Sequence, residues 1–401
     1  MTDRRYDAIV VGARCAGSPT AMLLARRGYR VLLIDRARFP PDTVSTHLIH
    51  APGVAALDRW GLLDRLVATG CPAIGTYSFD FGPLSISGTP RPVGGTAVAY
   101  GPRRTVLDKL LIDAAGQAGA EIRDGFTLDE LIIEDGAVTG IRSHARHGPP
   151  VAERARVVIG ADGARSRVAA TAGAGRYHRK PMLAVAYYSY WSGFPADGAR
   201  WAVRPRRAAG ALSTNDGLTM VVAAWPAAEF QAMKKDLERN YLAVLRSVFG
   251  DRLAGARREE RLAGGGAANH FRTPYGPGWA LVGDAGYLKD PVTAQGITDA
   301  FHDAELCTQA VDETFTGRRT WTEAMAGYQR RRDTRVLPLY EFTTQIGDLA
   351  EPPPPEFLHL LGAIAGNQDA MDQFVSVFAG TLSPAKFFDP AHIGQLAGTP
   401  A

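Results

Sequence analysis

The most constraining segment of this chain is residues 9–36, where an apolar stretch leads into a glycine turn, an apolar helical pattern and a second apolar stretch that ends on an acid. This order predicts a strand, a turn, a helix and a second strand, which is the unit that binds a dinucleotide. Gly12 allows the tight turn, and Gly17 lets the helix pack close to the strand and direct its N-terminus at a pyrophosphate. Asp35 ends the second strand, where its carboxylate can accept a hydrogen bond from a ribose hydroxyl. The expected cofactor-binding residues of this unit are Gly12, Ala13, Arg14, Ala16, Gly17, Asp35 and Arg36.

The turn departs from the usual pattern at one position. Arg14 stands where a middle glycine normally lets the backbone approach the pyrophosphate. We expect the Arg14 side chain to point outward, where its charge would meet a phosphate or the adenosine ribose. Taken alone, the turn would therefore be a weak signal.

Two later segments strengthen the prediction of a dinucleotide site. Residues 157–167 form a buried apolar stretch that ends in Asp162-Gly163 and carries two arginines, and residues 279–306 run from an apolar stretch through Gly283-Asp284-Ala285 to a proline segment and a helical pattern. Together with the N-terminal turn, these segments resemble the three fingerprints of the flavoprotein aromatic hydroxylases, the family typified by para-hydroxybenzoate hydroxylase. The resemblance covers roughly residues 5–340.

The resemblance implies FAD as the cofactor and a role for each segment. Asp284 would bind the ribityl chain, and the segment from Pro291 to Gly296 would line the isoalloxazine. The following helix would point its N-terminus at the flavin pyrimidine ring, where negative charge develops on reduction. The further cofactor-binding residues expected from the resemblance are Arg104, Asp162, Gly163, Gln295, Gly296 and Ile297, with Arg104 chosen over its neighbour Arg103 by register alone.

The motifs are separated by segments of another character, so we expect an α/β fold whose domains interleave. The Rossmann-like FAD-binding domain comprises residues 1–75, 101–175 and 266–340. Residues 76–100 and 176–265, which include aromatic-rich strand patterns, resemble the antiparallel β-sheet domain that covers the active site in the hydroxylase family. The four prolines at 352–355 precede a helical pattern at about 357–378, within a C-terminal helical region of residues 341–401.

Composition indicates a soluble enzyme. The 401 residues are 46% hydrophobic and 21% charged, with a formal charge of +4 and no dense basic stripe with interleaved aromatics, which argues against nucleic-acid binding. No apolar stretch reaches the roughly 18 residues of a membrane span, and the N-terminus enters the first strand without a signal peptide, so we expect a cytoplasmic protein. Three scattered cysteines favour neither a disulfide framework nor a metal site.

The electron donor is left open by the sequence. No second glycine fingerprint follows a strand, so a separate nicotinamide domain is not expected. Either NADPH or NADH visits the flavin transiently, or a partner flavin reductase supplies the electrons.

The resemblance implies an FAD-dependent monooxygenase that uses O2 to form a flavin hydroperoxide and inserts one oxygen atom into a small or mid-sized aromatic or polyketide-like substrate. Two alternatives share the fold: an ene reductase of the geranylgeranyl-reductase type, and a flavin-dependent halogenase, although residues 191–195 do not match the halogenase motif Trp-x-Trp-x-Ile-Pro. His47 is the candidate catalytic residue, because it follows the first unit in a region near the flavin in the family. A structural role for His47 at the start of the next helix is the competing interpretation.

Overall fold

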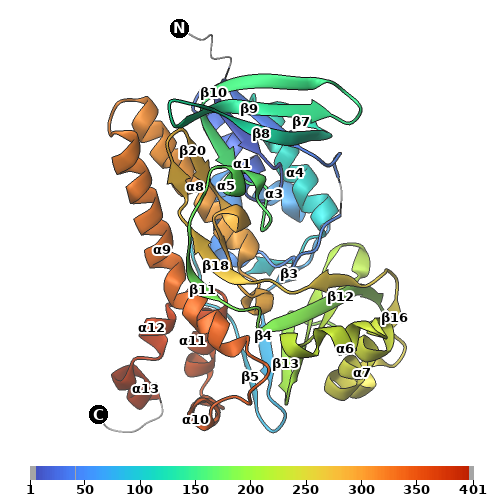
Figure 1. The fold of residues 1–401 in the computed structure, drawn as a ribbon. Helices are drawn as coiled ribbons and strands as arrows, with labels where there is room; N and C mark the ends of the chain where they lie inside the picture. The colour runs from blue at the N-terminus through green and yellow to red at the C-terminus, as the bar shows by residue number, and fades with distance from the viewer. Residues whose placement is uncertain (1–5, 41, 397–401) are drawn as a thin grey trace.

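A parallel sheet organises the cofactor half of the chain, and Figure 1 shows it in the computed structural model, which describes residues 6–40 and 42–396. Strand β1 (Tyr6–Val11) lies between β2 (Val31–Asp35) and β10 (Pro150–Gly160), with all neighbours parallel. β7 (Glu121–Asp124) and β20 (Trp279–Leu281) extend the parallel array on its two sides, and β19 (Tyr275–Gly276) adds an antiparallel edge. The central strands are continuous apolar runs because both faces of the sheet are covered.

The two faces of this sheet are covered differently. Helices α1 (Gly17–Ala25), α4 (Arg104–Gln117) and α8 (Gly296–Phe315) share one core with the strand side chains that face them. On the other face, β8 (Phe126–Glu134), β9 (Ala137–Ala145) and the short helix α5 (Arg167–Thr171) enclose a second core. The expected Rossmann-like unit is therefore present, with an antiparallel β8–β9–β10 extension in place of a second helical layer.

A second large sheet forms the other half of the molecule. Its order is β16-β12-β15-β14-β13-β4-β5, with β17 also on β12. The bounds are β4 (Tyr77–Asp80), β5 (Ser85–Gly88), β12 (Ala184–Ser192), β13 (Ala199–Arg204), β14 (Arg207–Ser213), β15 (Thr219–Pro226), β16 (Arg257–Arg258) and β17 (Ala263–Gly265). The sheet is antiparallel as expected except at one pair, because β4 runs parallel to β13. Helix α7 (Leu237–Phe249) packs its apolar face on the outer side of this sheet.

Smaller elements join the two halves. The three-stranded sheet β11 (Arg176–Lys180), β18 (Asn269–Arg272) and β21 (Tyr287–Leu288) pairs segments expected in different domains. Strands β3 (Ala73–Ile74) and β6 (Ala99–Tyr100) form a further pair, close to helices α2 (Ala51–Arg59) and α3 (Leu63–Val67). Helix α6 (Phe230–Lys234) precedes α7.

Long helix α9 (Trp321–Ile346) runs along both halves of the molecule in Figure 1 and crosses the domain boundary expected at residue 340. The C-terminal region that follows is helical, as expected, with α10 (Pro355–Ile364), α11 (Gln368–Phe378), α12 (Pro384–Phe387) and α13 (Pro390–Leu396). The helical region expected at about 357–378 contains two helices, because Gly366 adopts a φ of +87° and the Asn367 side chain then caps α11. Within the described residues, no helix is both long and apolar enough to cross a bilayer.

The N-terminus of α9 generates a stability prediction. The Thr320 hydroxyl accepts a hydrogen bond from the Glu323 amide at 3.3 Å, and the Glu323 carboxylate accepts one from the Thr320 amide at 3.0 Å. Thr320→Ala should lower the free energy of unfolding by about 1 kcal/mol, because the Glu323 amide loses its acceptor and the Glu323 carboxylate loses the hydroxyl that donates to it. Thr322→Ala, an exposed change in the same turn, is the matched control and should stay within about 0.5 kcal/mol of the parent in the same chemical denaturation series. Equal effects of the two variants would contradict the cap.

Candidate functional site

A cavity of about 1040 Å³ runs from the glycine turn after β1 to the inner face of the second sheet. It collects segments that are far apart in the sequence. The predicted cofactor residues in its wall are Gly12, Arg14, Ala16, Asp35, Arg36, Arg104, Asp162, Gly163, Asp284, Pro291, Gln295, Gly296 and Ile297. Ala13 and Gly17 are buried directly behind this wall, and His47 is not among the described residues that line it.

At the turn, glycine is required by close backbone contacts. A Cβ on Gly17 would lie 1.7 Å from the Gly12 carbonyl oxygen, and a Cβ on Gly12, whose φ is +103°, would lie 2.4 Å from the Ala161 carbonyl oxygen. Asp35 also holds the turn, since its two carboxylate oxygens each accept a backbone hydrogen bond at 2.8 Å, from Ala13 and Ala37. The carboxylate lies in the cavity wall as the ribose prediction requires, and it has a structural role that the sequence did not indicate.

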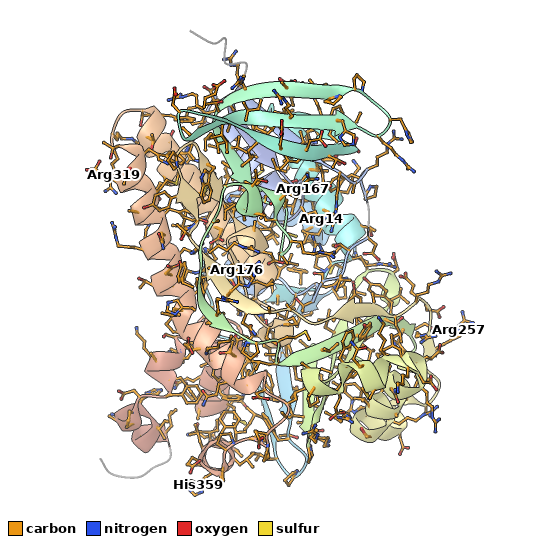
Figure 2. The ribbon with its side chains drawn as sticks, viewed as in Figure 1. Arg14, Arg167, Arg176, Arg257, Arg319 and His359 are labelled. Carbon is orange, nitrogen blue, oxygen red and sulfur yellow. The ribbon has the colours of Figure 1, made fainter. Side chains whose placement is uncertain are left out.

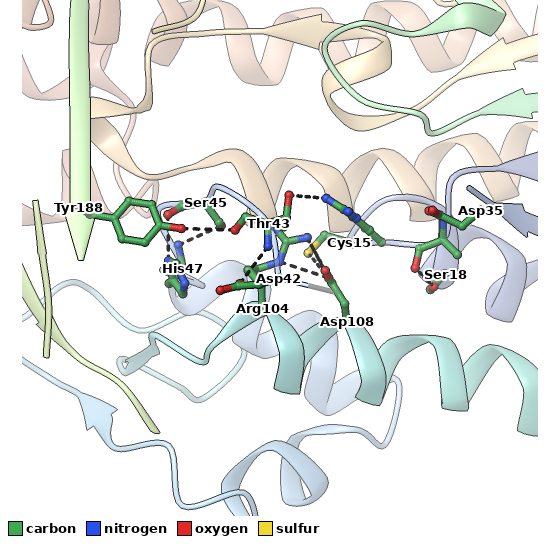
Figure 3. Close-up of polar contacts among 12 residues, drawn as sticks. Cys15, Ser18, Asp35, Asp42, Thr43, Ser45, His47, Arg104, Asp108 and Tyr188 are labelled. Carbon is green, nitrogen blue, oxygen red and sulfur yellow. Dashed lines mark hydrogen bonds and ion pairs between the residues drawn. The ribbon is translucent and has the colours of Figure 1, made fainter. Parts of the chain in front are cut away.

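Beside the turn, Arg104 is locked in the cavity wall (Figure 3). One of its guanidinium nitrogens, Nη2, lies 2.8 and 2.9 Å from the two carboxylate oxygens of Asp108, and the Cys15 thiol donates to the same carboxylate at 3.4 Å. Burial raises the pKa of Cys15, so this thiol stays protonated and serves packing and hydrogen bonding. Arg103 points elsewhere, to Glu260 at 2.7 Å and over the Tyr190 ring. The structure therefore places Arg104, and not Arg103, at the cavity.

Asp162 and Gly163 lie in the wall with a structural task of their own. The Asp162 carboxylate accepts hydrogen bonds from the backbone amides of Arg167 at 2.6 Å and Val168 at 3.2 Å, which caps α5. Gly163 has a φ of +79° and no atom within 4 Å of where a Cβ would be. These residues thus shape the cavity edge through the turn that they form.

The mouth of the cavity is rich in arginine. Figure 2 shows Arg14, Arg167 and Arg176 around the same central region, and Arg36 and Arg165 belong to the same wall. Arg14 donates to the Thr43 hydroxyl, so its side chain points away from the turn as expected. Within the described residues, none of these five guanidinium groups forms an ion pair with a carboxylate. The mouth therefore suits phosphate oxygens, which arginine binds in a bidentate manner.

Asp284 follows Gly283, which packs against Ala16 of the glycine turn, and it faces the open space of the cavity. Its carboxylate is accessible there, and no donor within the described residues reaches it. Protein nevertheless surrounds the carboxylate at longer range, and this desolvation raises the pKa of Asp284 to about 6. An unpartnered acceptor in this position fits the hydroxyl groups of a ribityl chain.

The first residue of α8 also fits a bound cofactor. Gly296 lies at the cavity, and no atom comes within 4 Å of where its Cβ would be. The protein itself therefore does not require glycine here, whereas a ring system placed against the helix N-terminus would. The α8 N-terminus also presents free backbone amides to that position.

Residues 291–297, which would line the flavin, are held by hydrogen bonds to three other parts of the chain. The His50 Nε2 lies 3.0 Å from the Thr293 carbonyl oxygen, and the Thr293 hydroxyl is 2.9 Å from that of Thr343 on α9. The side-chain amide of Gln295 donates to the Phe378 carbonyl at 2.6 Å, which connects the segment to the end of α11. These three contacts join residues that are 50 to 243 positions apart in the sequence, and no local pattern in the sequence indicates them.

His47 forms hydrogen bonds through both ring nitrogens and does not line the cavity, and its catalytic role stays a prediction. Its Nδ1 lies 2.9 Å from the Ser45 carbonyl (Figure 3), and its Nε2 lies 2.6 Å from the Tyr190 hydroxyl, so both nitrogens are engaged. Burial lowers the pKa of His47 to about 3, which keeps the ring neutral. Its contribution is to hold residues 43–46, which do line the cavity.

Three wall residues were missed by the sequence analysis. Lys289 donates to Asp299 at 2.6 Å, and the Tyr287 hydroxyl donates to the same buried carboxylate. The three side chains form a compact polar cluster at the flavin end of the cavity. Their spacing along the chain, 287 to 299, follows no metal or cofactor motif, so only the fold reveals the cluster.

Comparisons with known proteins agree with this geometry. The model of the FAD binding domain family matches residues 5–343. The digeranylgeranylglycerophospholipid reductase of Methanocella arvoryzae is 26% identical over 342 residues, covering 80% of this chain and 81% of that protein.

Among solved structures, the flavin-dependent brominase Bmp2 superposes with a TM-score of 0.82 at 16% identity, covering 98% of this chain and 97% of that one. The p-nitrophenol 4-monooxygenase PnpA of Pseudomonas putida superposes with a TM-score of 0.78 at 18% identity, covering 94% and 98%. At these identities the two superpositions show the shared fold alone.

Gly296→Ala tests the fit of a cofactor at the α8 N-terminus. The methyl group meets no protein atom, so the apo protein should keep its melting temperature or gain slightly, while FAD affinity should fall at least about tenfold, or 1.4 kcal/mol, by titration calorimetry. Gly362→Ala on α10, which also has open space around it, should leave FAD affinity unchanged. Full FAD affinity in Gly296→Ala would place the cofactor elsewhere.

Asp284→Asn should separate stability from cofactor binding. Because the folded-state pKa of Asp284 is raised to about 6, the folded state loses stability relative to the unfolded state as pH rises from about 4 through 6. The apo variant should therefore melt higher than the parent at pH 7.5, and this gain should disappear as the pH is lowered toward 4.

FAD affinity of the same variant should fall roughly tenfold, because a charged acceptor is lost. Asp58→Asn, an exposed change of the same charge on α2, should alter neither property. A lower apo melting temperature in Asp284→Asn at pH 7.5 would refute the assignment.

Proposed function

This chain belongs to the FAD binding domain family and is an FAD-dependent oxidoreductase, and on that premise we propose that it is a monooxygenase acting on an apolar aromatic or polyketide-like substrate. The overall reaction would consume substrate, O2, NAD(P)H and a proton, and would release hydroxylated substrate, water and NAD(P)+. FAD, when bound, supplies the electron transfer and the activation of O2. The protein residues bind and orient the substrate and exclude water.

The observation that carries the proposal is an apolar chamber where the cavity reaches the second sheet. Ala186 on β12 pairs with Ala224 on β15, and Ala224 pairs with Ala208 on β14, so small side chains form a continuous row across three strands. Val222 and Gly210 lie in the next row on the same face, and Leu212 and Met220 line the cavity one row further along. The alanines thus leave space for a substrate next to residues 291–297, and the polar side chains of Tyr188 and Arg200 on the same sheet also line the cavity.

Water exclusion favours oxygen transfer. An activated oxygen species on a flavin is lost as hydrogen peroxide if water reaches it, so the reaction needs a dry chamber. The Tyr188 hydroxyl, which donates to the Thr43 carbonyl at 3.3 Å, is a polar group in this part of the wall and could orient an oxygen-bearing substrate.

A second candidate is an ene reductase. It is favoured by the relative of Methanocella arvoryzae, whose name is that of a prenyl-lipid reductase and which matches most of this chain. The same chamber would accommodate a prenyl double bond, and oxygen would then be dispensable.

For the electron donor we propose a nicotinamide nucleotide that binds transiently at the arginine-rich mouth. Arg36, Arg165 and Arg176 are available there for phosphate groups in addition to those of FAD. NADPH, with its additional 2′-phosphate, is the expected donor. If neither nucleotide reduces the bound flavin, a separate flavin reductase takes this role.

The proposed monooxygenase activity is tested by tracing labelled oxygen into the product. FAD-loaded protein is supplied with NADPH and a panel of phenols, naphthols, anthraquinones and geranylgeraniol under ¹⁸O2, and products are analysed by mass spectrometry. We expect one ¹⁸O atom in the product and substrate-dependent oxygen consumption. A product that gains two hydrogen atoms under anaerobic conditions would instead establish the ene reductase, and a halide-dependent product the halogenase.

Ala224→Leu tests whether the substrate binds in the apolar chamber. The added side-chain carbons occupy the row of small residues, so kcat/KM should fall at least about tenfold, or 1.4 kcal/mol, while FAD content stays normal. Leu218→Ala in the loop before β15, outside the lining residues, serves as the control. Unchanged turnover in Ala224→Leu would show that substrate binds elsewhere.

A further inference from the structure

A second cavity, of about 1270 Å³, lies beneath the C-terminal helices. It is enclosed by the end of α9, by α10, α12 and α13, and by strands β4 and β13 of the second sheet, which lie together at the lower end of the molecule in Figure 1. Its wall is strongly aromatic, with side chains that include Phe79, Phe81, Trp201, Phe342, Phe357 and Phe388. Nothing in the cofactor site accounts for a chamber of this size.

The two cavities share a partition. Trp201, Val292 and Leu349 line both of them. Val292 belongs to the segment 291–297 at the flavin end, so the second cavity approaches the reaction chamber directly. A ligand that passed the partition would have one end beside the flavin and the other beneath the C-terminal helices.

The partition combines a residue on a strand with a residue in a loop. The Trp201 ring stacks on Phe79 with centroids 4.9 Å apart and planes 9° from parallel, which fixes its orientation. Leu349 lies in the loop between α9 and α10, and its own backbone amide reaches only the Gly347 carbonyl, at 3.1 Å. The Leu349 side chain is buried between the two cavities, and unlike Trp201 it belongs to no strand or helix.

The charges around the second cavity select against an anion. Arg204 is paired with Asp80 at 3.0 Å and Arg206 with Glu229 at 2.7 Å, so both cations of this wall are neutralised. The acids Asp348, Glu351 and Glu356 line the same wall, and within the described residues no ion pair joins them to a cation. A negatively charged end group would meet repulsion here.

We propose that the second cavity binds the apolar tail of a long, uncharged substrate, whose reacting end lies in the flavin chamber, and that Leu349 is the plug between the two. The aromatic wall supplies the apolar surface that such a tail buries. The shared partition explains why one molecule occupies both spaces. The inference deepens the proposed function by naming the substrate class, and it does not depend on which reaction the flavin performs.

Binding to the second cavity is tested with FAD-loaded protein and the neutral fluorophore Nile red, displaced by 1-dodecanol or by dodecanoate. We expect saturable binding at one site and displacement by dodecanol at least tenfold more effective than by dodecanoate. Ala363→Trp on α10 and Ala385→Trp on α12 fill the cavity and should each weaken Nile red binding at least tenfold at normal FAD content. Leu358→Trp, an exposed position on α10 outside the lining, should bind as the parent does.

Three results would overturn the proposal: no saturable Nile red binding, unchanged binding in both filled variants, or equal displacement by the alcohol and the carboxylate. The partition is tested separately by the visible spectrum of bound FAD, which dodecanol should perturb in the parent. In Leu349→Trp, Nile red should still bind while dodecanol no longer perturbs the flavin spectrum. An unchanged response in this variant would refute Leu349 as the plug.

The outcomes are distinct from those of the oxygen-transfer test. Failure of ¹⁸O incorporation with intact Nile red binding would change the reaction and leave the second cavity assigned. Loss of Nile red binding with intact oxygen transfer would remove the second cavity alone.

Discussion

The architecture depends on the contact of three backbone segments at the glycine turn. The first turn of α1, the end of β1 and the residue after β10 approach so closely at Gly12, Gly17 and Ala161 that no side chain fits between them. This packing brings the carboxyl ends of the parallel strands and the helix N-terminus to one point, which is where a crevice opens in sheets of this type. The cofactor cavity is therefore a direct result of backbone geometry, and the arginines around it add charge to a site that the backbone has already shaped.

The flavin end is organised by a different principle. Residues 291–297 are held by contacts from α2, α9 and the end of α11, so their position depends on the C-terminal helices as well as on the FAD-binding half. The C-terminal region is thus part of the reaction chamber. This connection also explains why a cavity beneath those helices can share a wall with the chamber on the second sheet.

Sequence reasoning was most successful where a few neighbouring residues determine the structure. The glycine turn, the Asp162 and Asp284 segments and the outward direction of Arg14 follow from local backbone requirements, and the structure brings all of them to one cavity. The sequence does not reveal which face of the second sheet lines the chamber, because this depends on the register that places Ala186 opposite Ala224. The role of His47 was equally inaccessible, since Tyr190, which engages its ring, is 143 positions away. The parallel pairing of β4 with β13 arises from a long crossover that has no local signature.

The interleaved order of the cavity residues has a consequence for biosynthesis. The wall begins at Val11 and is completed by Gly347 and Leu349, so a nascent chain presents only fragments of it until residue 349 has left the ribosome. The β1–α1–β2 unit can assemble early, because its contacts are local. FAD, by contrast, has no complete binding site to occupy during translation. The cofactor can therefore occupy its whole site only after residue 349 has been synthesised, so the segments that fold earlier do so without it.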